Sequence, residues 1–526
     1  MGIYLNPGNE NFKEALRADI YVDKTEMLSV LSRFMDKGNK YICLSRPRRF
    51  GKTIAGNMIS SYYSKGCDSR EIFENLKISK IPGYEDKLNK YNVIKIDLNS
   101  EYQNTRDKTK VFVKLEEELL SEFRQQFLDI SFRDDDSLSK CILRVYSHDS
   151  EETFIIIIDE YDVFVREQVD ESLFNEYLSF LNGLFKSDTL RPAISLAYLT
   201  GILPIVRDKI QSKLNNFREY TILDAGELSE YIGFTSDEVK SLCDEYDMSF
   251  EECRRWYDGY SLKNFEIYNP ESVVRSMETK EYGSYWGKTS SYEVISDRIR
   301  NNFAGIKEDV IRMMAGESVY VNVTSFLNTM NSFKGKDDAF TYLIHVGYLA
   351  YDKNGETCRI PNYEVRREWN NALKVEEGYE VTSKIIEESR ELLKKTWDGD
   401  ADAVASALDE SHIHVTSNRS YNNEDALQSA IYLAFIFALN KYNVYKELTT
   451  GKGFADVVYV PVYPDIPAMI IELKRNDCTE SAINQIKEKK YSERLSNYTG
   501  NLLFVGINYD EKDKTHTCRI ERFVKD

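Results

Sequence analysis

The chain has 526 residues, of which 42% are hydrophobic and 30% charged. This composition is typical of a globular protein with room for two to four domains. The formal net charge of −18 argues against a protein coated in nucleic acid, because Lys and Arg neutralise the phosphates in such complexes. Residues 421–526 carry 14 Lys and Arg against 15 Asp and Glu, so a near-neutral C-terminal module can still approach DNA or RNA.

Two further features of the composition limit the function classes. No apolar run approaches the roughly 20 residues that a bilayer-spanning helix needs, and the N-terminus lacks a signal sequence. We therefore expect a cytoplasmic protein with no membrane partner. The eight cysteines lack C-x-x-C spacing, and His412 and His414 alternate as on a strand or loop with no cysteine nearby. Neither a disulfide framework nor a zinc site is predicted.

A phosphate-binding loop is predicted at residues 46–53, which read Arg-Pro-Arg-Arg-Phe-Gly-Lys-Thr after the apolar run Tyr41–Leu44 and before a helix-competent stretch. In such a loop, backbone N–H groups and the helix N-terminus surround the phosphates of ATP, a lysine reaches the β and γ oxygens, and a hydroxyl coordinates Mg²⁺. Arg46 stands where G-x-x-x-x-G-K-[ST] has its first glycine, so the backbone must turn there without glycine's freedom. The predicted binding residues are Arg48, Arg49, Phe50, Gly51, Lys52 and Thr53, with Thr53 also a metal ligand.

Two strand ends complete this predicted site. The run 153–158 is apolar and β-branched and leads into Asp159 and Glu160, as a buried parallel strand that delivers carboxylates would. We expect Asp159 to hold Mg²⁺ and Glu160 to polarise the attacking water. Thr200 ends the run 194–199 and either contacts the γ-phosphate or is a strand-end turn residue.

The rest of the N-terminal half alternates strands and helices, and the middle becomes mostly helical. Strands are expected at Tyr41–Leu44, Val93–Leu98, Phe154–Ile158 and Ile194–Leu199, in a parallel sheet with helices on both faces. Residues 235–239 read as the capping-box start of a helix. The aromatic residues of 256–260 and 285–286 are compatible with base stacking, but a packed interface is favoured. Runs 343–350 and 358–362 suggest a hairpin, such as the wing of a winged helix.

Six short motifs resemble those of bacterial AAA-ATPase-like proteins that carry a C-terminal PD-(D/E)XK nuclease domain. The motifs are Pro47–Thr53, Ile158–Asp162, Leu199–Gly201, Leu214–Phe217, Trp256–Tyr260 and Tyr268–Pro270. The resemblance covers nearly the whole chain, and it implies that Arg-Pro-Arg-Arg is this family's own form of the loop. It also implies that residues 21–25 pack near the nucleotide core, whereas the residues alone equally allow a strand-to-helix turn with Thr25 as N-cap.

The C-terminal part has the core element order of PD-(D/E)XK nucleases. We expect a helix, three strands, a helix and a strand at Glu424–Leu439, Val444–Leu448, Ala455–Val460, Ala468–Lys474, Ser481–Leu495 and Leu502–Ile507. The two-residue period of a strand puts Glu472 and Lys474 on one face, with Ile471 and Leu473 on the other. An exposed edge-strand ion pair is the alternative explanation for Glu472 and Lys474.

These residue types suit metal-dependent phosphodiester hydrolysis. Asp456 and Glu472 provide the hard oxygen ligands that Mg²⁺ prefers, and Lys474 orients water and stabilises charge. Sixteen positions separate the two carboxylates, enough for one hairpin. The resemblance implies the same Asp456, Glu472 and Lys474, followed by Gln485 and Tyr491 on the next helix. A further acid is expected at Glu424, with Glu447 as its competitor.

The predicted fold is therefore α/β: a P-loop NTPase parallel-sheet core with an N-terminal extension (1–220), a mostly helical lid with a winged-helix candidate (221–400), and a restriction-endonuclease-like domain (401–526). We expect an ATPase coupled to a Mg²⁺-dependent nuclease that acts on nucleic acid, with DNA favoured. The alternative is a nucleotide-switched binding module with an inactive nuclease fold. Homo-oligomerisation stays open, as does the arginine finger, for which the candidates are Arg48, Arg49, Arg207 and Arg218.

Overall fold

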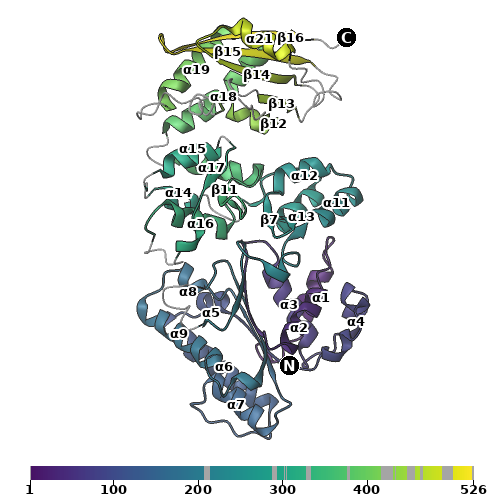
Figure 1. Cartoon of the computed structure of the whole chain (residues 1–526). Coiled ribbons are helices and arrows are strands. Elements are labelled where there is room, and N and C mark those ends of the chain that lie inside the picture. The colour runs from purple at the N-terminus through teal and green to yellow at the C-terminus, as the bar shows by residue number, and fades with distance from the viewer. Residues whose placement is uncertain are drawn as a thin grey trace. The chain divides into compact units, whose positions relative to one another are not determined.

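The computed structural model divides the chain into two compact units, and Figure 1 labels their elements. The described residues are 2–205, 214–286, 293–300, 303, 305–314, 316–326, 333–375, 380–415, 431–432, 434–446, 457–461, 466–488 and 501–523. Unit 1 is Met1–Ser290 with Tyr320–Val365, and unit 2 is Ser291–Val319 with Arg366–Asp526. The three-part division at residues 220 and 400 stays a prediction.

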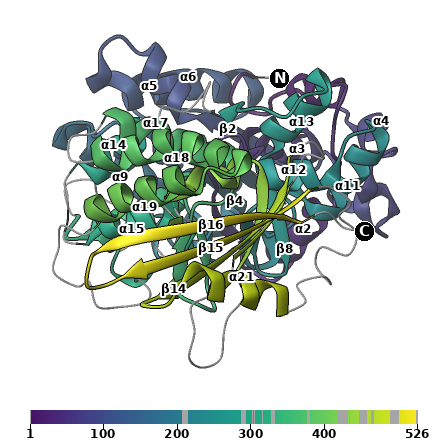
Figure 2. The same ribbon diagram turned by 90° about the horizontal axis from the view of Figure 1, so that it is seen from above.

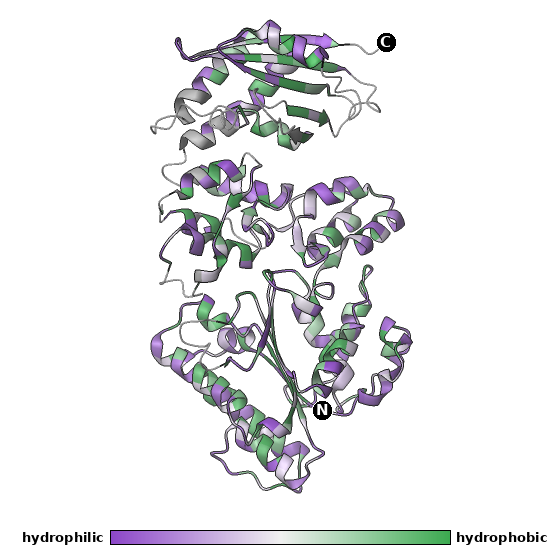
Figure 3. Cartoon of the chain, in the orientation of Figure 1, coloured by the Kyte–Doolittle hydropathy of each residue, from purple (hydrophilic) through white to green (hydrophobic). Residues whose placement is uncertain are grey.

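Unit 1 contains a five-stranded parallel sheet in the order β2-β3-β4-β1-β5. Its strands are β1 (Tyr41–Ser45), β2 (Asn92–Asp97), β3 (Phe154–Asp159), β4 (Ile194–Gly201) and β5 (Arg218–Tyr220). The four predicted strands are confirmed to within two residues at each end, and β5 was not predicted. Every residue of β3 is buried, as expected of a central parallel strand, and Figure 3 shows the strands of this sheet as mostly hydrophobic.

Helices cover both faces of this sheet, with α1 to α4 on one side and α5 to α9 on the other (Figure 1). They are α1 (Glu10–Leu16), α2 (Met27–Asp36), α3 (Lys52–Tyr63), α4 (Arg70–Phe73), α5 (Leu98–Asn104), α6 (Val111–Gln126), α7 (Leu138–His148), α8 (Val163–Arg166) and α9 (Glu171–Phe185). Thr25 is not the side-chain cap of α2. Its hydroxyl instead accepts the N–H of Ile78 at 3.0 Å, while Lys24 Nζ lies 2.6 Å from Glu238 Oε2.

A helical subregion of unit 1 follows the parallel sheet. It contains α11 (Ser236–Glu245), α12 (Phe250–Tyr257) and α13 (Pro270–Thr279), with the small sheet β6 (Phe234–Thr235), β8 (Phe265–Tyr268) and β7 (Tyr260–Leu262). The predicted capping box is confirmed, because Thr235 and Glu238 exchange side-chain and backbone hydrogen bonds. Trp256, Tyr257 and Trp286 are buried, so the packing interpretation of the aromatic residues holds.

The predicted hairpin at residues 343–362 was partly wrong. Residues 343–346 belong to α16 (Lys336–Val346), which ends at Gly347 in the left-handed conformation with φ 91°. A short apolar run has no period that separates a buried helix from a strand, and α16 is buried on nearly all sides. The hairpin is shorter, β10 (Ala350–Asp352) with β11 (Thr357–Arg359), and β9 (Val319–Tyr320) pairs beside β11.

Unit 2 contains a mixed five-stranded sheet in the order β12-β13-β14-β15-β16. Its strands are β12 (Tyr442–Lys446), β13 (Val457–Pro461), β14 (Ala468–Arg475), β15 (Leu502–Asp510) and β16 (Thr515–Phe523), and its helices are α14 (Glu293–Ile299), α15 (Ile306–Met314), α17 (Tyr363–Val375, which begins in unit 1), α18 (Glu380–Asp398), α19 (Ala401–Val415) and α21 (Thr479–Glu488). Figure 2 shows α21 on one side of this sheet and α18 and α19 on the other. The C-terminal strand order is confirmed, with β16 as an addition.

Some predictions for unit 2 fail or lie outside the described residues. His412 and His414 are in α19, not on a strand or loop. Of the predicted helix 424–439, residues 424–430 lie outside the described part, and residues 436–440 form a 3-10 turn. Among the described helices, none combines the length and the apolar character that crossing a bilayer requires.

Candidate functional site

The loop between β1 and α3 has the geometry of a phosphate-binding loop, but its turn lies elsewhere than expected. The left-handed residues are Arg49 (φ 69°) and Gly51 (φ 88°), and Arg46 is not among them. Arg46 is fully buried behind the loop, where its Nη1 donates to the carbonyls of Ser45 at 2.8 Å and Tyr220 at 3.0 Å. The Arg46 side chain therefore links the start of the loop to β5. Because the left-handed residues are Arg49 and Gly51, the position of the first glycine does not require glycine's backbone freedom.

Lys52 begins α3 and is turned into the loop. It is 5% exposed, and its Nζ donates to the carbonyls of Arg46 at 3.1 Å and Pro47 at 2.9 Å. Burial lowers the pKa of Lys52, against the attraction of Glu160 and Asp159, which raises it. No side chain caps the N-terminus of α3, so its partial positive charge is available to an anion.

The strand register brings the predicted carboxylates and Thr200 to the same sheet edge as the loop. Asp159 on β3 pairs with Thr200 on β4, and Thr200 pairs with Leu44 on β1. Burial raises the pKa of Asp159, whereas the hydroxyl of Thr53 and the ammonium of Lys52 lower it. The two predicted Mg²⁺ ligands of this site are therefore neighbours.

Glu160 contacts an arginine that the sequence analysis did not select. Arg166 Nη2 donates to Glu160 Oε2, and Arg166 Nε lies 3.2 Å from Asp162 Oδ2. Burial raises the pKa of Glu160, while Arg166 and Lys52 lower it. The i,i+4 spacing of Asp162 and Arg166 was a signal for this pair. The contact with Glu160 depends on a turn in which Glu160 has φ 51°, which the sequence does not reveal.

The outer part of the loop contacts the helical subregion of unit 1. Phe50 is buried and packs edge-on against Tyr260, with ring centroids 5.5 Å apart. Asn269 Nδ2 lies 3.5 Å from the carbonyl of Arg48, and Arg49 pairs with Glu271 at 3.9 Å. The Phe50 side chain thus has a packing role, and only its backbone stays a candidate for phosphate binding. Two of the arginine-finger candidates lie elsewhere. Arg218 is exposed on β5, and Arg207 lies outside the described residues.

The second candidate site lies on the central strand β14 of unit 2. Glu472 is 0% exposed, and Lys474 Nζ donates to its Oε1 at 3.1 Å and to Gln485 Oε1 on α21. Ile471 and Leu473 belong to the core on the opposite face. The predicted alternation is confirmed, and the alternative of an exposed edge-strand ion pair is wrong, because β14 lies between two strands and the carboxylate is buried.

The remaining predicted nuclease residues lie outside the described residues. They are Asp456, Tyr491, Glu424 and Glu447. Val457, the residue after Asp456, pairs with Ile471, the residue before Glu472. Within the described part of the chain, no three His, Cys, Asp or Glu side chains form a group that would hold a metal.

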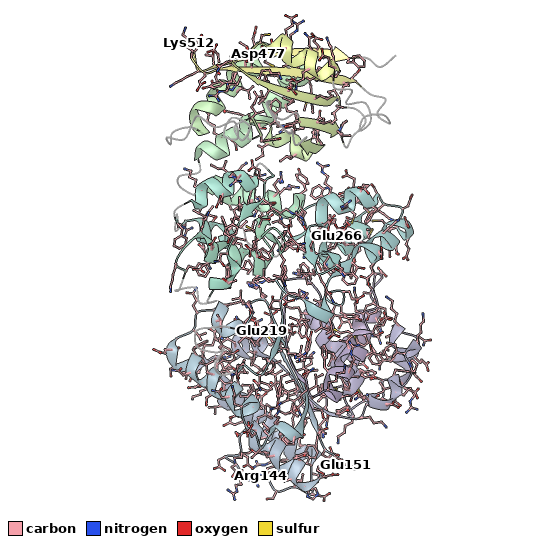
Figure 4. All side chains as sticks on the ribbon, viewed as in Figure 1. Arg144, Glu151, Glu219, Glu266, Asp477 and Lys512 are labelled. Atoms are coloured by element: carbon pink, nitrogen blue, oxygen red, sulfur yellow. The ribbon has the colours of Figure 1, made fainter. Side chains whose placement is uncertain are left out.

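One residue on the Glu472 face was missed. Asn508 on β15 pairs with Lys474, is buried, and accepts the N–H of Asp477 at 3.0 Å; Figure 4 labels Asp477.

Two family models match the chain. Residues 7–211 match the model described as Predicted AAA-ATPase, and residues 422–518 match the PD-(D/E)XK nuclease superfamily. The chain carries both domains. The AAA-ATPase-like domain includes β1 to β4, with the loop, Asp159 and Thr200. The nuclease-superfamily domain includes β12 to β15, with Glu472 and Lys474.

The chain is also similar to proteins over longer spans. A sequence from Azotobacter chroococcum mcd 1, described as an uncharacterized protein in the vnfD 5′ region, is 21% identical over 519 residues, which is 94% of each chain. The ORC2 protein of Aeropyrum pernix aligns over 68% of this chain and 96% of its own, with 10% identity and a TM-score of 0.27. PCH-2 of C. elegans aligns over 64% and 71%, with 13% identity and a TM-score of 0.22. TM-scores this low carry no functional weight.

Proposed function

We propose that this chain is an ATPase whose nucleotide state controls a metal-dependent nuclease in the same polypeptide, with DNA as the favoured substrate. The observation that carries the proposal is the convergence of Lys52, Asp159, Glu160 and Thr200 at one edge of a parallel sheet. That edge is where open α/β sheets bind their ligands.

The residues at the loop fit Mg-ATP. An uncapped helix N-terminus and a left-handed Gly51 with open space at its Cα suit a phosphate chain. The buried carboxylate of Asp159 beside the hydroxyl of Thr53 suits a hard divalent cation. Bound Mg²⁺ would neutralise phosphate charge. Thr53 and Asp159 are the residues that would hold it.

Three residues of the chain have separate roles in ATP hydrolysis. The ammonium of Lys52 exchanges its hydrogen bonds to the carbonyls of Arg46 and Pro47 for contacts with the β- and γ-phosphate oxygens of ATP. Glu160 accepts a proton from the attacking water. Thr200, at the end of the strand between β1 and β3, contacts the γ-phosphate.

The nuclease proposal rests on the buried Glu472. Its carboxylate supplies a hard oxygen ligand, and its Oε1 lies 3.1 Å from the ammonium nitrogen of Lys474. Glu472 and Asp456 are the residues that would hold a divalent metal, which supplies Lewis-acid activation of the phosphodiester. Lys474 stabilises negative charge on the reacting phosphate and orients water, and Gln485 fixes the position of its ammonium group.

Phosphate release from ATP tests the ATPase part. Glu160→Gln is expected to keep ATP affinity and to slow hydrolysis by about 10²-fold or more, because only proton abstraction is lost. Hydrolysis by Glu160→Gln at the wild-type rate would remove Glu160 as the base.

A further inference from the structure

Arg166 is held between two carboxylates at the ATPase site. Its side chain is 12% exposed, with Nε 3.2 Å from Asp162 and Nη2 bonded to Glu160. Burial alone would lower the pKa of Arg166, but Asp162 and Glu160 together raise it. The contact with Asp162 is an ion pair without a hydrogen bond from Nε, and the contact with Glu160 is a charge-assisted hydrogen bond, so two carboxylates restrain the guanidinium.

The Asp162 end of this arrangement is fixed by the segment after β4. Asp162 Oδ2 accepts the N–H groups of Ile202 at 3.1 Å and Leu203 at 2.8 Å. The intervening Tyr161 donates its N–H to the carbonyl of Thr200 at 3.1 Å. The turn that carries the predicted base and the end of the Thr200 strand are therefore one hydrogen-bonded assembly.

At the Glu160 end the backbone is fixed, because the N–H of Glu160 donates to Asp159 Oδ1 at 2.9 Å and its carbonyl accepts the N–H of Val163 at 3.0 Å. Glu160 adopts φ 51°, a conformation that costs energy for a residue other than glycine and persists only when its surroundings impose it. Its long side chain has several rotamers. Besides Arg166, the charged groups that act on Glu160 are Lys52, Asp162 and Asp159.

We propose that Arg166 is a positioning residue for ATP hydrolysis: its guanidinium pairs with Asp162, which is bound to the segment after the Thr200 strand, and it holds the Glu160 carboxylate within hydrogen-bond reach of the attacking water. The inference rests on the proposed role of Glu160 as the base. It adds that a third group orients this base, as in other sites where a base is held by a neighbour, and that the orienting group pairs with Asp162, which is hydrogen-bonded to the segment after the Thr200 strand.

The expected effect is on turnover and not on nucleotide binding. Arg166→Gln should lower kcat by about 10²-fold, because a misplaced catalytic group loses about that much. KM and the Kd for ATP should change less than about twofold, since Lys52, Thr53 and Asp159 are untouched. Arg166→Lys keeps the cation but loses the two-sided geometry, and should recover about tenfold of the lost rate.

The experiment compares Arg166→Gln, Arg166→Lys, Glu160→Gln and the Glu160→Gln/Arg166→Gln double variant. Phosphate release gives kcat and KM, and a fluorescent ATP analogue gives Kd. Arg144→Gln is the matched control, because Arg144 also pairs through Nε and Nη2 with a carboxylate, Asp136. Arg144 lies on α7, at the end of unit 1 away from Glu219 of β5 (Figure 4).

Support requires a lower kcat with unchanged Kd in Arg166→Gln, partial recovery in Arg166→Lys, and a double variant no slower than Glu160→Gln alone. Equal loss of kcat and ATP affinity, additive effects in the double variant, or a rate equal to that of Arg144→Gln would overturn the inference. If Arg166→Gln does not fold, the kcat and Kd of Arg166→Lys decide in the same way. An inactive wild type, or Glu160→Gln with the wild-type rate, would instead defeat the proposed ATPase chemistry.

Discussion

Replacing Lys52 by Met removes the ammonium that the loop directs to the phosphates. At ATP concentrations 100-fold above Kd, binding contributes about 2.7 kcal/mol to the stability of the folded state. Unit 1 has about 340 residues, for which the unfolding entropy near the midpoint is about 0.7 kcal/mol/K. Mg-ATP should therefore raise the midpoint of wild-type unit 1 by about 4 °C, and the shift should vanish in Lys52→Met.

Differential scanning fluorimetry with and without Mg-ATP measures this shift, each variant against its own nucleotide-free midpoint. Lys40→Met is the matched control, because Lys40 Nζ also donates to two backbone carbonyls, those of Arg191 and Ile194. Lys40 comes directly before the first residue of β1, whereas the loop with Lys52 follows the last residue of this strand. Lys40→Met should keep the full 4 °C or so. Equal shifts in wild type and Lys52→Met would refute the loop as the nucleotide site.

Two other residues give independent predictions. Asp159→Asn should abolish the Mg²⁺-dependent part of ATP affinity while leaving binding in EDTA unchanged, because the lost carboxylate is the expected metal ligand; isothermal titration with and without Mg²⁺ measures both, and equal Mg²⁺ dependence in wild type and variant would contradict the assignment. Burial lowers the pKa of His516, against Asp409, which raises it, so the unfolded chain binds the proton more readily and stability falls as the pH drops below about 6.5. The unit 2 midpoint should fall more between pH 7 and 5 in wild type than in His516→Gln, and parallel curves would refute this.

The parallel sheet was predictable because its central strands are unbroken. Residues 154–158 are buried on both faces, and a near-continuous hydrophobic run is typical of a strand in that environment. The carboxylates that follow this run then reach the sheet edge by geometry alone. The strand β5 was not predictable, because it has three residues and exposes Arg218, which leaves no period to detect. Residues 343–346 of α16 were predicted as part of a hairpin for a different reason, because a short buried apolar run has no period that separates a helix from a strand.

The candidate sites were predictable where a period or a fixed motif sets the direction of a side chain. Glu472 and Lys474 share a face because strand side chains alternate. Arg166 could not be placed, because it reaches Glu160 only through a left-handed turn at Glu160. Arg46 was misjudged for a related reason, since the loop places its left-handed residues at Arg49 and Gly51.

The central claim, two enzymatic sites in one chain, is tested most directly by a cleavage assay on labelled single- and double-stranded DNA and RNA, with Mg²⁺, Mn²⁺ or EDTA, and with or without ATP. Wild type should cut only with a divalent metal, and Glu472→Ala should not cut. Glu521→Gln is the matched control, because Glu521 lies in β16 of the same sheet and pairs with Lys487 at 2.7 Å; it should cut like wild type, and all three proteins should bind ATP. If wild type cuts none of these substrates, or Glu472→Ala cuts as well as wild type, the nuclease proposal is contradicted and a nucleotide-switched binding module takes its place.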